Sequence, residues 1–108
     1  MYQDTKGKIP VYDFVTSCDP KMKAKLLKYM ELLEEYGKDL RSPYSEYLEE
    51  GIFELRVKVS SNISRVLYFF IEDKKIVMTN GFIKKTQKTP RNEIELAKKR
   101  RKDYLERR

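Results

Sequence analysis

The fold is decided by residues 53–71, which read FELRVKVSSNISRVLYFFI. Apolar residues occupy every second position from Phe53 to Val59, with charged residues between them, and this alternation predicts a half-buried strand with one apolar face. Ser60 to Asn62 is a turn, and Ile63 to Ile71 is a longer and more apolar strand. We therefore expect these two segments to pair antiparallel near the centre of a sheet.

The residues that follow extend this sheet and then leave it. Glu72-Asp73-Lys74 is a turn into a third strand, Lys75 to Phe82. Thr89 is an N-cap with Pro90 at the first helical position, which predicts a final, basic helix. Its apolar stripe is thin and consists of Ile94, Ala97 and Tyr104. A helix with so narrow a stripe is expected to dock loosely.

Three further elements are expected before residue 53. Lys8 to Thr16 alternates loosely and predicts a strand, which Pro10 restricts to a sheet edge or a strand start. Asp19-Pro20 opens a helix with apolar residues every three or four positions, and Gly37 ends it. Ser42-Pro43 repeats the cap-and-proline signal, and Gly51 closes the short helix that it predicts.

The expected element order is therefore β-α-α-β-β-β-α in a single domain that spans residues 1–108. This order describes an α+β fold with an antiparallel sheet, two N-terminal helices packed on one face and a C-terminal basic helix.

Composition excludes several classes of site. The chain has 108 residues, no histidine and one cysteine, Cys18. Zinc fingers, histidine-based triads and an intramolecular disulfide are therefore excluded, and no metal site is expected. The longest apolar run, Val66 to Ile71, is far too short to cross a membrane, and no signal peptide is visible. We expect a cytoplasmic protein with no membrane association.

Positive charge is concentrated at the end of the chain. From Lys84 to Arg108 there are eleven Lys and Arg against four Asp and Glu, whereas residues 1–83 carry thirteen of each. The whole net charge of +7 therefore lies in the last 25 residues. A basic edge on a neutral body favours a polyanionic or strongly acidic partner.

The helix that begins at Pro20 has its charges reversed relative to its macrodipole. Lysines crowd its positive N-terminal half and glutamates its negative C-terminal half, and each misplaced charge costs roughly 0.3–1 kcal/mol where exposed. The residues are Lys21, Lys23, Lys25 and Lys28, then Glu31, Glu34 and Glu35. These lysines either face a polyanion or form an ordinary solvated face.

A cluster of cations is expected on one face of the sheet. If Ser61 and Asn62 form a two-residue hairpin loop, Lys58 lies opposite Arg65, and Arg56, Lys58 and Arg65 share a face. A slip by one residue would set Arg65 among apolar side chains, and the cost of burying its charge opposes that slip. Such cations suit a phosphodiester that gains charge in its transition state. Alternatively, these cations simply form the solvent-exposed face of an amphipathic strand.

Three segments resemble the HigB branch of the RelE superfamily, a branch often described as phage-derived. They are Phe53–Arg56, Arg65–Phe69 and Gly81–Pro90, and the helix that carries Glu93, Ala97 and Arg101 continues the match. The similarity covers about Ile9 to Tyr104. The run KKTQKTP at residues 84–90 is its most specific part.

This resemblance implies a RelE-like fold and a toxin of a bacterial type II toxin–antitoxin pair. Such toxins are ribosome-dependent mRNA endoribonucleases that inhibit translation and need no metal or other cofactor. The 2′-hydroxyl of the RNA attacks, which leaves a 2′,3′-cyclic phosphate and a 5′-hydroxyl. The catalytic residues implied here are Arg56, Lys58, Arg65 and Lys85. The RNA-binding residues expected are Phe82, Lys84, Lys88, Arg91, Lys98, Lys99 and Arg101.

Two of these assignments have structural alternatives, and the general base has two candidate explanations. Phe82 either stacks on a base or closes the core, and the basic residues from Lys98 to Lys102 either grip phosphates or form a solvated helix face. The tyrosine that RelE-type toxins place six residues after the position of Lys85 is Arg91 here. One candidate for the base is Lys58, because the neighbouring arginines disfavour its charged form. Alternatively, the ribosome orients the 2′-hydroxyl.

The partners implied by the resemblance are the ribosome with its mRNA and a cognate helix-turn-helix antitoxin of the HigA type. Toxin and antitoxin are expected to form a heterotetramer. Two other functions compete with the endoribonuclease. One is a ParE-like poison of DNA gyrase, and the other is a basic RNA- or DNA-binding module without activity.

Overall fold

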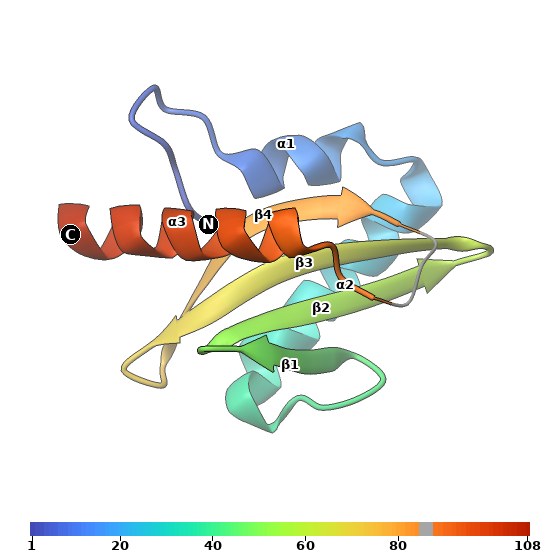
Figure 1. Cartoon of the computed structure of the whole chain (residues 1–108). Coiled ribbons are helices and arrows are strands. Elements are labelled where there is room, and N and C mark those ends of the chain that lie inside the picture. Colours follow the sequence, from blue (N-terminus) through green and yellow to red (C-terminus); the bar gives the residue numbers. More distant parts are fainter. Residues whose placement is uncertain (85–87) are drawn as a thin grey trace.

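The computed structural model describes residues 1–84 and 88–108, and these form a four-stranded antiparallel sheet between two layers of helices (Figure 1). The strands lie in chain order across the sheet. They are β1 (Ser45–Glu49), β2 (Ile52–Val59), β3 (Asn62–Ile71) and β4 (Lys75–Ile83).

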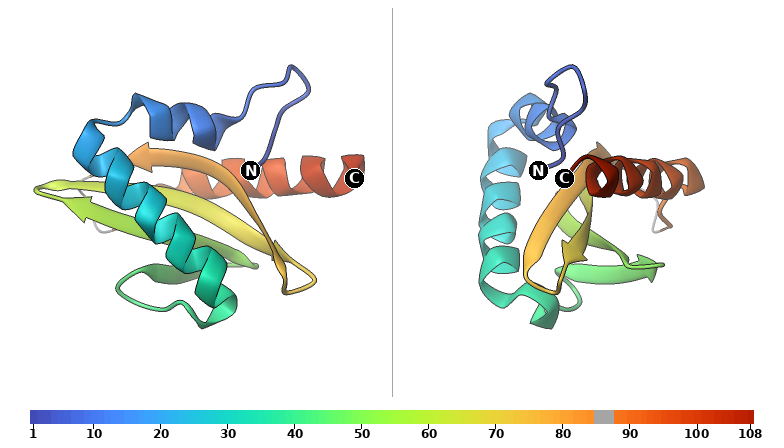
Figure 2. Two further views of the ribbon diagram at one scale, coloured as in Figure 1. Left: turned by 180° about the vertical axis from the view of Figure 1, so that it is seen from behind. Right: turned by 90° about the vertical axis from the view of Figure 1, so that its left-hand side faces the viewer.

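Helices cover both faces of this sheet. Helices α1 (Pro10–Ser17) and α2 (Pro20–Tyr36) lie on one face, and α3 (Arg91–Arg107) lies on the other. The right-hand view of Figure 2 shows the sheet between α2 and α3. A short 3-10 helix, η1 (Gly37–Asp39), follows α2. The α+β fold with two N-terminal helices on one face and a C-terminal helix is confirmed.

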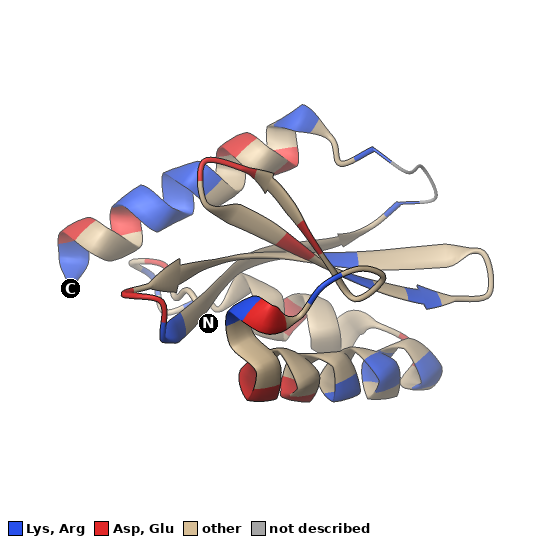
Figure 3. Ribbon diagram, turned by 90° about the horizontal axis from the view of Figure 1, so that it is seen from below, with Lys and Arg blue, Asp and Glu red and all other residues tan. Residues whose placement is uncertain are grey.

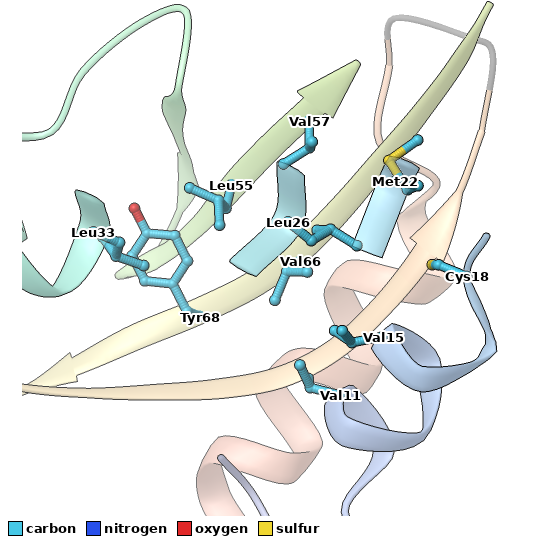
Figure 4. Close-up of a cluster of buried hydrophobic side chains, with 10 residues drawn as sticks. All are labelled: Val11, Val15, Cys18, Met22, Leu26, Leu33, Leu55, Val57, Val66 and Tyr68. Atoms are coloured by element: carbon cyan, nitrogen blue, oxygen red, sulfur yellow. The ribbon is translucent and has the colours of Figure 1, made fainter. Parts of the chain in front are cut away.

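The larger core lies under α1 and α2 (Figure 4). Helix α2 begins where its cap predicts, because the Asp19 carboxylate accepts a hydrogen bond of 3.0 Å from the Met22 amide. Leu26 and Leu33 of α2 are fully buried against Leu55 and Val66 of the sheet and the other members of this cluster. The smaller core lies under α3 and includes Ile52, Leu67, Phe69 and Ala97.

The first predicted strand is wrong, because Pro10–Ser17 forms helix α1. Val11 and Val15 are one helical turn apart and both are buried against the sheet. Pro10 takes the first helical position, where its missing N–H breaks no hydrogen bond. The apolar spacing of this segment therefore follows the period of a helix and not that of a strand.

Helix α1 packs closely on β4, and Gly81 makes this approach possible. A Cβ atom at position 81 would lie 2.4 Å from Cδ2 of the Phe14 ring. No such contact is sterically allowed, so any larger residue would force the Phe14 ring to shift from its place on β4.

The predicted helix between Ser42-Pro43 and Gly51 is also wrong, because Ser45–Glu49 forms edge strand β1. Its backbone pairs with β2, with Ser45 opposite Leu55 and Tyr47 opposite Phe53. Glu50 and Gly51 both have positive φ, 45° and 81°, which is the requirement of a tight two-residue hairpin turn. The glycine therefore turns a hairpin, and the element order is α-α-β-β-β-β-α.

Candidate functional site

The predicted cations do share one sheet face, but the strand register differs by two residues from the expected one. Arg56 lies directly opposite Arg65, and Lys58 lies opposite Ile63, because the hairpin loop is Ser60-Ser61. A shift of two residues leaves every side chain on its face. Arg56, Lys58 and Arg65 therefore still project to one side, which is the face covered by α3.

The three cations lie at different depths. Arg65 is on the inner strand β3 between Arg56 of β2 and Phe82 of β4, and it is 0% exposed. The Arg56 side chain is 28% exposed. Lys58, closer to the hairpin, is exposed. A ligand can thus reach Lys58 and part of Arg56 directly, whereas the charge of Arg65 acts from beneath.

A buried carboxylate holds this cluster together. Glu54 is fully buried and accepts a hydrogen bond of 2.5 Å from Nε of Arg56. Its second oxygen accepts from the hydroxyl of Thr89, two residues before α3. The predicted N-cap at Thr89 is therefore wrong, because Pro90 is the N-cap of α3 and the Thr89 hydroxyl binds Glu54. Glu54 therefore connects β2 to the residues that lead into α3, and it fixes the guanidinium of Arg56.

Burial and neighbouring charge both act on Arg65. Burial lowers the pKa of Arg65, Glu54 opposes this by raising it, and Arg56 lowers it further. Arginine stays protonated even so. The cluster thus places two positive guanidinium groups and one carboxylate in a poorly solvated part of the face, where charges interact more strongly than in water.

Sequence reasoning missed Glu54 because it treated this strand face as solvated. Two signals could have identified it. Glu54 stands two residues before Arg56, so both side chains lie on one face, and the expected C-terminal helix needed a sheet face to cover. A carboxylate beneath a covering helix requires a partner, and Arg56 is that partner.

The remaining predicted lysines lie at the rim. The Lys84 amide donates to the Ile63 carbonyl at 3.0 Å, so the chain leaves the sheet beside β3, and the side chain of Lys84 is exposed. Lys88 is exposed as well. Lys85, the fourth predicted catalytic residue, lies outside the described residues.

Phe82 is almost fully buried, 8% exposed, in the core under α3. A base could stack on it only after this core opened, so its position favours the structural interpretation. Its role in binding RNA stays a prediction.

Three predicted RNA-binding residues of α3 contact the last residue of β1 and the turn that follows it. Arg91 donates to both carboxylate oxygens of Glu49, one of them at 2.7 Å, and Lys98 pairs with Glu49 and Glu50. Arg101 donates to the Glu50 carbonyl. Hydrogen bonds from Arg91 and then Lys98 lower the pKa of Glu49 to about 2. These cations hold α3 in place, and their role as phosphate ligands stays a prediction.

Lys99, the last of the predicted basic residues, is exposed on α3. Beside the ion pairs of Arg91 and Lys98, a cleft of about 380 Å³ separates β1 from the start of α3. Arg56 and Lys88 line it together with Thr89, so the partly exposed guanidinium opens into this cleft. The arrangement can bind a phosphate whose nucleotide occupies the cleft.

The described residues offer neither a metal site nor a membrane-spanning helix. No group of three or more Asp, Glu or Cys side chains within residues 1–84 and 88–108 could hold a metal ion. None of the helices in the described part of the chain is long and apolar enough to span a bilayer.

The fold and the cationic face agree with a comparison against protein families. The model of the phage derived protein Gp49-like (DUF891) family matches residues 13–102, which include all four strands and most of α3. The chain belongs to the Gp49-like family. This family is part of the RelE/HigB-like toxin group, and membership suggests a RelE-like toxin. A search of curated proteins finds no match.

Proposed function

We propose that this Gp49-like chain is the toxin of a type II toxin–antitoxin pair and a ribosome-dependent mRNA endoribonuclease. The observation that carries the proposal is the direct cross-strand pairing of Arg56 with Arg65 on one face, beside Lys58 and above the buried Glu54. Like charges directly opposite one another destabilise a sheet. A phosphate with developing negative charge is the ligand that such a pair suits best.

The proposed reaction needs no group beyond the RNA and a base. The 2′-hydroxyl loses its proton to a base and attacks the adjacent phosphorus, and the bond to the 5′-oxygen breaks as that oxygen takes up a proton. The products are a 2′,3′-cyclic phosphate and a 5′-hydroxyl. Donors aimed at the oxygens that gain charge stabilise the transition state, each by about 10²–10³ in rate.

The role of each residue of this face in the proposed reaction follows from its exposure. Arg56, fixed by Glu54 and open to the cleft, donates to a non-bridging oxygen. Arg65 adds positive charge from beneath, where water screens it little. Lys58 is exposed at the side and is the candidate base, the alternative being that the ribosome orients the 2′-hydroxyl. Glu54 is buried and orients Arg56, so it does not take the proton itself.

The proposal includes partners. The ribosome and its mRNA supply the substrate, and a cognate HigA-type antitoxin with a helix-turn-helix domain forms a heterotetramer with the toxin. Acidic segments of an antitoxin would complement the exposed cations at the rim, Lys58, Lys84 and Lys88.

The test is primer extension on a translated mRNA with wild type, Arg56→Ala and Lys58→Ala. Wild type is expected to make discrete, ribosome-dependent cuts, and each variant is expected to cut about 10²–10³ times more slowly. Lys74→Ala, an exposed lysine in the turn between β3 and β4, is the control and is expected to cut normally.

Lys58→Ala is the sharper variant, because an exposed side chain can be removed with little change in stability. Arg65→Ala is less informative, since its burial means that loss of folding could cause loss of cleavage. Unchanged cutting by both Arg56→Ala and Lys58→Ala would exclude this face as the site. Gyrase-linked DNA breaks in place of RNA cuts would instead identify a ParE-like poison.

A further inference from the structure

Helix α2 carries a row of lysines on the sheet side opposite to the Arg56–Arg65 pair. Lys21, Lys25 and Lys28 are four and three residues apart, so they lie on one stripe of the helix, which we call the lysine stripe. Met22 and Leu26 turn toward the core, whereas Lys21 and Lys28 are exposed. The stripe spans two turns of helix, about 10 Å.

The lysine stripe destabilises the helix that carries it. Lys21 is the second residue of α2, at the positive end of the macrodipole, and the like charges at spacings of three and four repel one another. None of the three lysines forms an ion pair with an acidic residue of the described parts of the chain. A charge pattern that costs stability is typical of a binding surface.

The lysine stripe is continuous with the proposed catalytic face. Nζ of Lys25 donates to the Lys58 carbonyl at 2.6 Å and lies 5.7 Å from the centre of the Tyr29 ring. The side chain of Lys58 itself belongs to the opposite face of the sheet. Only the end of the β2–β3 hairpin therefore separates the two cationic surfaces.

Charge is segregated along α2. Figure 3 shows the lysines in the half of α2 at the same end of the molecule as the β2–β3 hairpin, and the acidic residues in the other half. The turn between β3 and β4, which carries Glu72 and Asp73, lies at the opposite end of the molecule (Figures 1 and 3). A polyanion bound along the lysine stripe therefore lies at the hairpin end of the molecule, away from the acidic residues of α2 and of this turn.

We propose that the lysine stripe binds the phosphate backbone of a double-helical RNA segment, separate from the strand held at the Arg56–Arg65 face. The choice of RNA over other polyanions rests on the proposed function. A protein partner would need an apolar anchor at the centre of its interface. The stripe offers no exposed aromatic anchor, because the Tyr29 ring beside it is half-buried between Lys25 and Tyr44. Its exposed apolar neighbour is Leu27, 48% exposed, and leucine is under-represented among such anchors. Lysine ammonium groups without such an anchor are suited to bind phosphate groups, and double-helical RNA presents phosphates at its surface.

The experiment measures the affinity of the full chain for a fluorescent RNA hairpin over a range of salt concentrations. The test variant is Lys21→Gln/Lys28→Gln, which leaves Lys25 and its contact with Lys58 intact. The control variant, Lys6→Gln/Lys74→Gln, removes the same charge from two exposed lysines outside the hairpin end. Comparison of the two pairs separates a local surface from net charge.

The test variant is expected to bind the hairpin about tenfold or more weakly, and the slope of log affinity against log salt should fall by about two, one per lost phosphate contact. The control pair is expected to keep the wild-type slope. The test variant should melt at or above the wild-type temperature, because Lys21→Gln removes a charge that opposes the macrodipole. A weaker binder that is at least as stable cannot be explained by misfolding.

Equal losses from both pairs, or none from either, would overturn the lysine stripe as a site. A stripe-dependent affinity for an acidic peptide that exceeds the affinity for the hairpin would overturn RNA as the partner. Lys58→Ala distinguishes this inference from the proposed function, since the Lys58→Ala protein should lose cleavage, whereas hairpin binding by it should still weaken when Lys21→Gln/Lys28→Gln is added. If Lys21→Gln/Lys28→Gln lowers hairpin binding but neither wild type nor any variant cuts translated mRNA, the lysine stripe is supported as an RNA site and the proposed endoribonuclease activity is rejected.

Discussion

Glu54 is the residue on which the geometry of the cationic face depends. Its two carboxylate oxygens accept from Arg56 on the same strand and from Thr89 before α3, and its charge offsets part of the burial of Arg65. A buried charge without its counter-charge is costly. One side chain therefore decides both where Arg56 points and whether Arg65 can remain buried.

At this scale, Glu54→Gln is expected to lower the free energy of unfolding by roughly 3–5 kcal/mol, because two guanidinium groups then lack their carboxylate. Urea denaturation measures this loss. Glu46→Gln is the matched control, since Glu46 lies directly opposite Glu54 on β1 and is partly exposed. It is expected to change stability by no more than about 0.5 kcal/mol. Equal effects of the two substitutions would contradict the role of Glu54.

At the scale of elements, α3 is attached more by polar contacts than by apolar burial. Only Ile94 and Ala97 of this helix are buried. The Asn80 amide of β4 donates to the Glu93 carboxylate at 2.9 Å, and Arg100 donates to the Thr79 carbonyl at 3.0 Å. Together with the contacts of the β1–β2 turn, these bonds fix a helix whose apolar stripe alone would hold it weakly.

The β1–β2 turn makes the attachment of α3 depend on pH. The pKa of Glu49 is about 2 in the folded chain against an ordinary value of 4.5. Its contribution to stability is therefore complete above pH 4.5 and is lost as the pH falls toward 2. Wild type should melt at a higher temperature than Glu49→Gln at neutral pH, and the difference should vanish near pH 2. A difference that stays constant with pH would show that Glu49 does not hold α3 through its charge.

On the scale of the whole molecule, the two ends of the chain are tied together. The Tyr2 amide donates to the Met78 carbonyl at 2.8 Å, which continues the sheet beyond β4, and its hydroxyl donates to Asp103 at 2.7 Å. The guanidinium groups of Arg100 and Arg107 lie 5.7 and 5.6 Å from the centre of the Tyr2 ring. The first residues of the chain thus clamp the second half of α3.

Tyr2→Ala is expected to destabilise the protein by roughly 1.5–3 kcal/mol, the usual contribution of a buried side chain of this size. Hydrogen exchange should become faster in the second half of α3 than in β3. Tyr2→Phe keeps the ring and loses only the bond to Asp103, so it should cost about 0.5–1.5 kcal/mol. Unchanged exchange in α3 of the Tyr2→Ala protein would show that the clamp does not hold the helix.

The sequence by itself determined the elements whose signals are long and local. Helix α2 begins at its Asp19 cap and ends at Gly37, and the alternation of residues 53–59 with the apolar run that follows defines the central strands. It also placed Arg56, Lys58 and Arg65 on one face, because a register error of two residues does not change the face. These features follow from periods of 3.6 and 2 that each segment carries within itself.

Tertiary structure decided what short segments become and how deep each charge lies. Residues 10–17 and 45–49 have patterns too short to choose between helix and strand, and the sheet face under α1 and the free edge of β2 made the choice. Arg65 and Glu54 are neighbours through the register of β2 and β3, but both are buried because Thr89 and α3 lie over that face. Burial is a property of what covers a residue, and the covering helix begins more than twenty residues further along the chain.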